Sequence, residues 1–255
     1  MLGRYRCVLL IAALAMLSAC GGKPEGAGAG GEAAPEEKVL YVLNWSDYIG
    51  ESTIKDFEAK TGIKVTYDVF DSNEVLETKL LAGRSGFDVV VPTAPFLERQ
   101  IKAGVFLKFD KSKLPNLVNM DPQIMERTAL HDPGNEHAIT YLWGTVGIGY
   151  NVDMVKKALG TDAIDSWSAV LEPGNAAKLA KCGIAMLDSP TDIFASVSIY
   201  KGLDPNSEKP EDLAAVEETL MKMRPYVKYL HSSSYINDLA AGEICVAVGW
   251  NGDVL

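Results

Sequence analysis

Short apolar runs alternate along the chain with amphipathic stretches, beginning near residue 38. Residues 38–44, 63–70 and 87–92 are rich in branched and aromatic side chains and predict strands. Between them, residues 53–62 and 73–83 carry apolar positions at helical spacing, and each ends in glycine, a common helix stop. The order strand, helix, strand predicts an α/β fold with parallel strands.

The alternation returns after a loop-rich middle section, residues 107–136. We expect extended segments in residues 137–151, where three glycines interrupt the pattern, and then a second set of strands and helices. Later strands are predicted at residues 184–188 and 243–250, with a long amphipathic stretch at 212–230. Two such sets predict two lobes.

These boundaries give an expected domain organisation. Lobe 1 takes residues 38–144, a hinge of extended strands takes residues 145–150, and lobe 2 takes residues 151–255.

Polar and aromatic side chains follow four of the predicted strands. In open α/β sheets, ligands bind beyond the carboxyl ends of the strands, so these residues are the candidate site. An alkylammonium ion needs carboxylates for its charge and aromatic faces for cation–π contacts and for its methylene groups. We therefore predict a pocket for an organic cation. The candidate ligand-binding residues are Trp45, Ser46, Asp47, Tyr48, Thr93, Asp192, Trp250 and Asp253.

Other kinds of site find less support. A phosphate site would need glycine-rich turns with Arg or Lys, and a metal site would need clustered ligands, so we expect neither a metal nor a cofactor. The sequence has no G-x-S-x-G and no H-E-x-x-H motif, and His131 and His231 lie in loops as surface or capping residues. We expect a binding protein with no catalytic residues. An exported hydrolase with paired carboxylates stays open as the alternative of another class, and a structural or adhesive role has the least support.

Each candidate residue also has a purely structural interpretation. The repetition of this chemistry at four strand ends favours the functional one. The structural alternatives are Trp45 as a core residue, Ser46, Asp47 or Thr93 as helix caps, Asp192 as a first-turn acid, and Asp253 as a turn residue.

The first 37 residues predict export rather than fold. Residues 1–20 have two arginines, an apolar run and small residues, which is typical of a secretory signal and too short for a membrane span. The end of this segment is similar to the bacterial lipobox, which implies lipidation of Cys20 and attachment to a membrane; a plain signal peptide is the alternative. Residues 21–37 are mainly Gly, Ala, Pro and Glu and predict a flexible linker.

Net charge and cysteine content bear on the class of ligand and on a disulfide. The net charge of −10 argues against binding of nucleic acid, because few cations are present to neutralise phosphates. Outside the first 20 residues only Cys182 and Cys245 remain, and an oxidising compartment favours a disulfide between them over two buried thiols. A monomer is the default expectation.

Several segments together resemble the putrescine-binding periplasmic proteins of bacterial polyamine transport. The resemblance covers residues 39–255 and implies a type II periplasmic binding fold, a periplasmic location and delivery of the ligand to a membrane ABC permease. The segments are NWSDYIG (44–50), TGIKVTYDVFDSNEVLETKLLAG (61–83), GFDVVVP (86–92), GIGYNVD (147–153) and HSSSYINDLAAGEICVAVGW (231–250).

The resemblance also implies roles for single residues. The tryptophan and serine of NWSDY touch the diamine in that family, which points to Trp45 and Ser46. The family usually has serine at Thr93 and glutamate at Asp192, so Asp192, one methylene shorter, is expected to reach the amine through water. The family's disulfide matches Cys182 and Cys245. Spermidine, an amino acid or an iron complex are alternative ligands, and the resemblance implies that a C-terminal part of lobe 1 is missing after Leu255.

Overall fold

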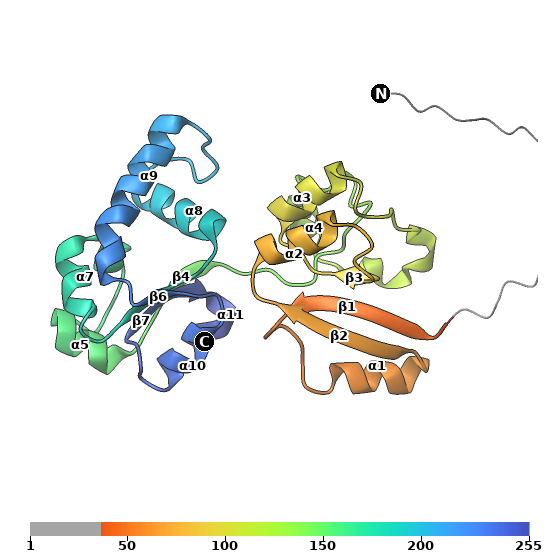
Figure 1. Ribbon diagram of the computed structural model, residues 1–255, viewed down its shortest axis with the longest axis horizontal. Coiled ribbons are helices and arrows are strands. Elements are labelled where there is room, and N and C mark those ends of the chain that lie inside the picture. The colour runs from red at the N-terminus through yellow and green to blue at the C-terminus, as the bar shows by residue number, and fades with distance from the viewer. Residues whose placement is uncertain (1–36, 255) are drawn as a thin grey trace, which may run out of the picture. The chain divides into compact units, whose positions relative to one another are not determined.

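The computed structural model describes residues 37–254 (Figure 1). Contacts divide the chain after Glu37, and the description concerns the unit that begins at Lys38. Predictions for the signal segment, the lipidated Cys20 and the linker lie outside the described residues, apart from Glu37 itself. Within residues 37–254, no helix combines the length and apolar character needed to cross a membrane.

The first sheet has three parallel strands, as the sequence predicts. The strands are β1 (Val39–Trp45), β2 (Lys64–Phe70) and β3 (Val89–Val90), in the order β2-β1-β3. Because β1 is central and parallel to both neighbours, its carboxyl end at Trp45 lies beside the ends of both other strands.

Three helices connect and cover these strands: α1 (Thr53–Thr61), α2 (Asn73–Leu81) and α3 (Ala94–Lys102). Figure 1 shows α1 on one side of the sheet and α2 and α3 on the other. The Ser72 side chain accepts a hydrogen bond from the Val75 amide, so it caps α2 as predicted. Gly62 ends α1 with a φ of 70°, a conformation that favours glycine. The core beside this sheet comprises Leu43, Phe70, Leu76 and Leu80. Below, the first lobe means this sheet with its helices, and the second lobe means the second sheet with its helices.

The middle section contains only short helices: η1 (Lys111–Lys113), η2 (Pro115–Asn119) and α4 (Pro122–Thr128). The extended segments expected over residues 137–151 are only partly present, because regular strand structure begins at Val146. Residues before it fold instead around a buried carboxylate. Asp132 accepts hydrogen bonds from the His137 and Ala138 amides at 2.8 and 2.9 Å, and from His137 Nδ1 at 2.9 Å.

The second sheet is mixed rather than fully parallel, which corrects the expectation from the sequence. Its strands are β4 (Val146–Tyr150), β5 (Ile184–Met186), β6 (Tyr229–Leu230) and β7 (Val246–Trp250), in the order β4-β7-β5-β6. Strand β4 runs antiparallel to β7 along its whole length, and the other pairs are parallel. Residues 146–150, which lie inside the predicted hinge, are therefore a strand of this sheet.

The helices around the second sheet follow the predicted alternation, with one difference. The amphipathic stretch at residues 212–230 is not a single element: α9 ends at Met223, and η3 and β6 follow. Pro225 explains the end of the helix, since proline lacks the amide that the helix interior needs. The helices are α5 (Val152–Leu159), α6 (Ser168–Leu171), α7 (Pro173–Leu179), α8 (Pro190–Tyr200), α9 (Pro210–Met223), η3 (Arg224–Tyr226), α10 (Ser234–Ala240) and α11 (Asn251–Val254).

Apolar side chains fill both faces of this sheet. One cluster contains Ile184, Met186 and Val246, and the other contains Ala185, Leu187 and Ala247, as alternation along a strand requires. The predicted disulfide is present: Cys182 and Cys245 are joined, and their Cα atoms are 5.4 Å apart.

Candidate functional site

The turn after β1 is held in place by hydrogen bonds to its backbone. Asn44 is 3% exposed, and its side chain accepts from the Trp45 amide (2.8 Å) and donates to the Tyr48 carbonyl (3.2 Å). Tyr141, from the segment that leads to β4, donates to the same Tyr48 carbonyl at 2.6 Å. These bonds present the Trp45 and Tyr48 side chains at the carboxyl end of the sheet.

Trp45 is part of a partly buried aromatic cluster. Its indole N–H donates to the Val91 carbonyl at 2.9 Å, and its ring lies 4.6 Å from the Phe70 ring. Trp250, from the end of β7, meets Trp45 edge to face with ring centroids 5.5 Å apart. The ring thus packs on Phe70, as the structural interpretation requires, and also contacts Trp250, while its role in ligand binding stays a prediction.

Asp192 lies beside Trp250, as the strand-end argument predicted. Its Oδ2 atom accepts from the Trp250 indole N–H at 3.2 Å and from the Ser189 hydroxyl at 2.8 Å. Its Oδ1 atom accepts no hydrogen bond from the part of the chain that the structure describes. This oxygen can accept from a bound cation, although Asp192 also occupies the first turn of α8.

Asp253 is held by one tyrosine from each lobe. Tyr48 donates to its Oδ1 atom at 3.0 Å, and Tyr235 donates to its Oδ2 atom. Burial, together with the negative charge of Asp253, raises the pKa of both tyrosine hydroxyls. The two phenols therefore remain protonated donors at neutral pH.

Ser46 and Asp47 are exposed at the outer edge of the cluster. The Ser46 hydroxyl donates to Asp47 Oδ2 at 2.9 Å and lies 3.1 Å from the Ser233 hydroxyl of the second lobe. Neither residue caps a helix in the structure, so that structural interpretation is wrong for both of them.

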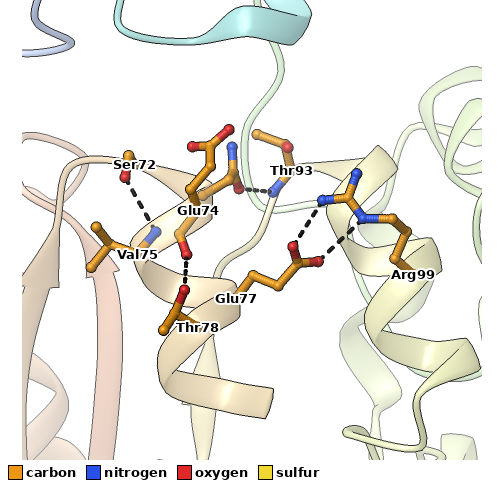
Figure 2. A network of polar contacts seen from close by, with 8 residues as sticks. Ser72, Glu74, Val75, Glu77, Thr78, Thr93 and Arg99 are labelled. Carbon is orange, nitrogen blue, oxygen red and sulfur yellow. Dashed lines mark hydrogen bonds and ion pairs between the residues drawn. The ribbon is translucent and has the colours of Figure 1, made fainter. Parts of the chain in front are cut away.

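Thr93 stands at the same end of the sheet, but its hydrogen bonds go to Asn73 and Leu97 and not to the aromatic cluster. Its amide donates to the Asn73 side chain at 3.0 Å (Figure 2). It precedes α3, yet its hydroxyl makes no capping hydrogen bond. A bidentate ion pair between Arg99 and Glu77, at 3.0 and 3.2 Å, ties α3 to α2 below it (Figure 2).

The site carries carboxylates that form no ion pair with a Lys or Arg of the described residues. Among residues 37–254, no ion pair involves Asp47, Asp192 or Asp253. Nor does this part of the chain hold a group of three or more side chains suited to a metal ion. Uncompensated carboxylates beside two indoles are the chemistry that an organic cation requires.

The indole pair is closed in this structure. Its edge-to-face contact leaves no space for a methylene chain between the rings, so a ligand held between them requires the rings to separate. A cavity of about 200 Å³ lies elsewhere in the second lobe and has a mainly apolar lining. It includes Ser189 and Ile193, which flank the Asp192 helix start, but neither indole.

Several residues in contact with the site were not among the candidates, including Tyr141, Ser189, Ser233 and Tyr235. Tyr235 is fully buried, and a buried aromatic near a helix start carries no sequence signal for a polar site. Ser189 directly precedes α8 and could have been found by the strand-end rule.

The histidines take structural roles. His231 Nδ1 accepts hydrogen bonds from the Ser233 and Ser234 amides at 3.0 and 3.1 Å, which agrees with the predicted capping role. His131 Nδ1 lies 3.0 Å from Glu98 Oε2. His137 Nδ1 forms a hydrogen bond with Asp132 Oδ1.

Comparison with known proteins identifies the family of this chain. Residues 52–255 match the family described as bacterial extracellular solute-binding protein. The chain belongs to this family. The putrescine-binding periplasmic protein SpuD of Pseudomonas aeruginosa is 56% identical over 230 residues, which are 90% of this chain and 63% of that protein. The corresponding protein of Escherichia coli, PotF, is 57% identical over 226 residues, which are 88% of this chain and 61% of that protein.

A solved structure agrees with these sequence relatives. The Tp0655 (TpPotD) lipoprotein of Treponema pallidum has a TM-score of 0.73 and 30% identity, and the match covers 84% of this chain and 64% of that one. The resemblance to putrescine-binding periplasmic proteins and the α/β solute-binding fold are thus confirmed, and these relatives are named as binding proteins or a lipoprotein, not as enzymes. The chain spans about three fifths of the length of the curated relatives it matches.

Proposed function

We propose that this protein is an extracytoplasmic solute-binding protein that captures a polyamine, putrescine first, and delivers it to a membrane ABC permease. The observation that carries this proposal is the set of unpaired aspartates around two facing indoles. The relatives above supply the choice of putrescine, since they are named as putrescine-binding. Spermidine or another cationic solute is the alternative ligand on the same fold.

A diamine fits the arrangement because charge and apolar surface alternate. Asp192 and Asp253 lie on the same lobe as Trp250, and each accepts hydrogen bonds from side chains that keep it in place. Each carboxylate can take one ammonium end, while Trp45 and Trp250 cover the methylene chain between the ends. Ser46, Asp47, Tyr48 and Thr93 line the wall supplied by the first lobe.

Lobe closure couples binding to transport in this proposal. Residues of the first lobe already contact the second through Tyr48–Asp253 and Trp45–Trp250. A ligand that bridges both lobes favours the closed state by its greater affinity for that state, and the closed state is the one a permease recognises. The protein acts as a monomer in the periplasm, attached to a membrane by lipid on Cys20, and needs no cofactor.

The test is calorimetric titration of the protein with putrescine, cadaverine, spermidine and arginine. We expect one-to-one binding of a diamine, and Asp253→Asn should weaken it about a hundredfold, because a buried ammonium loses its charged partner. Asp153→Asn, an exposed aspartate of the second lobe, is the matched control and should leave affinity unchanged.

Two outcomes would contradict the proposal. If no amine produces heat of binding, the protein is not a polyamine-binding protein. If Asp253→Asn binds putrescine as tightly as the unmodified protein, the ligand does not bind at Asp253. Turnover of a glycoside by the protein would favour the exported hydrolase instead.

A further inference from the structure

We propose that Tyr235 is a positioning residue that fixes the Asp253 carboxylate for an ammonium group of the ligand. This inference rests on the proposed function and adds to it a residue that the strand-end argument does not reach. Tyr235 does not face the ligand in this proposal; it acts through Asp253.

The hydroxyl of Tyr235 connects Trp250, the last residue of β7, with Asp253 in α11. It donates to Asp253 Oδ2 and accepts from the Trp250 amide at 3.2 Å. One fully buried phenol thus ties the carboxylate to the strand that carries the Trp250 indole. Because the accepting and donating bonds are both satisfied, the hydroxyl has a single favourable orientation.

Gly249 allows this close approach. A Cβ atom at position 249 would lie 2.6 to 2.9 Å from three atoms at the end of the Tyr235 side chain. The ring therefore packs directly on the backbone of β7, one residue before Trp250. A side chain packed this closely has little freedom to swing, so its hydroxyl holds Asp253 in a defined place.

The second tyrosine cannot replace this role. Tyr48 donates to the other oxygen, Asp253 Oδ1, but it belongs to the first lobe. Its bond exists only when the lobes are together, whereas Tyr235 and Asp253 share one lobe. Tyr235 is thus the donor that keeps the carboxylate oriented while a ligand enters, and each carboxylate oxygen retains a lone pair for the ammonium.

The experiment compares two variants that each lose one tyrosine hydroxyl that donates to an aspartate. Tyr235→Phe removes the donor to Asp253, and Tyr229→Phe removes a similar bond, from Tyr229 to Asp238 Oδ2 at 2.7 Å, in the same lobe. We expect Tyr235→Phe to weaken putrescine binding about tenfold, since hydrogen bonds to charged groups have effects of this order. Tyr229→Phe should stay within about twofold of the unmodified protein. Thermal unfolding of both variants measures the loss of stability that they share.

A double variant separates positioning from packing. If Tyr235 acts through Asp253, the variant with Tyr235→Phe and Asp253→Asn binds no more weakly than Asp253→Asn alone. If Tyr235 only supports the fold, the two losses multiply, and the inference is wrong.

The proposed function and this inference fail in different ways. If the unmodified protein binds no amine, the proposed function fails. If the unmodified protein binds putrescine and Asp253→Asn weakens it, but the two tyrosine variants behave alike, only the inference about Tyr235 fails.

Discussion

Replacement of Gly249 by alanine should destabilise the second lobe through a single added methyl group. The new Cβ would lie 2.6 Å from Cε2 and 2.7 Å from Cζ of Tyr235. The ring must retreat by about 0.8 Å to reach an ordinary van der Waals distance. Tyr235 is completely buried, so the atoms packed around the ring oppose that movement. Overpacking of this kind costs about 1–3 kcal/mol of the free energy of unfolding.

Gly147 provides a matched control. It lies directly opposite Gly249 in the register of β4 and β7, and a Cβ atom there would meet nothing within 4 Å. Neither glycine has a positive φ, so alanine fits the backbone at both positions. Gly147→Ala should leave stability unchanged or raise it by up to about 1 kcal/mol, because alanine restricts the unfolded chain.

Thermal and urea unfolding measure the difference between these two variants. For a loss of about 2 kcal/mol, a protein of this size should lose about 4–8 °C in Tm. Equal unfolding midpoints for Gly249→Ala and Gly147→Ala would refute the close packing of Tyr235 on β7. Putrescine affinity should fall in Gly249→Ala alone, because the displaced hydroxyl no longer reaches Asp253.

Two further predictions concern stability away from the site. Reduction of the Cys182–Cys245 bond should lower the free energy of unfolding by at most about 4 kcal/mol, since the bond links residues 63 apart; identical urea midpoints with and without reductant would contradict this. Burial alone would raise the pKa of Asp132. Hydrogen bonds from His137 and nearby amides outweigh this effect, so the pKa lies below its ordinary value of 3.8. A carboxyl whose pKa is lowered by folding stabilises the fold at any pH above its pKa in the unfolded chain. This contribution is lost as the pH falls toward the lowered pKa of the folded state. The free energy of unfolding should therefore drop below about pH 4. Acid titration of unfolding should show a smaller drop in Asp132→Asn; a drop of the same size in both would contradict the assignment.

Much of the fold could be predicted from local patterns. The apolar runs at residues 38–44 and 63–70 became β1 and β2, and Ser72 caps α2, because these signals depend on neighbours in sequence. The direction of β4 could not be predicted in this way. Its sequence, VGIGY, reads as extended, but only its pairing with β7 makes it antiparallel.

The candidate site shows the same division. Trp45, Asp192 and Trp250 were predicted because each lies at or after the end of a strand, and parallel strands bring their ends to one edge. Tyr235 follows no buried strand directly, so the strand-end rule does not reach it. Its position depends on the close packing of its ring against the backbone at Gly249, which is distant in sequence. Thr93 was predicted by the same rule as Trp45, yet its hydrogen bonds go to Asn73 and Leu97 and not to the indoles, since the rule gives the edge of the sheet and not the direction of a side chain.

The negative charge of the Asp253 carboxylate and its orientation depend on different groups. Tyr48 and Tyr235 orient the Asp253 carboxylate, but as neutral donors they leave its negative charge in place. Because no Lys or Arg among the described residues pairs with this aspartate, a bound cation is the group that can compensate the charge in a partly buried setting. If the proposed site is right, neutral solutes of the same shape should bind more weakly than an ammonium, because the tyrosines position the charge of Asp253 without neutralising it.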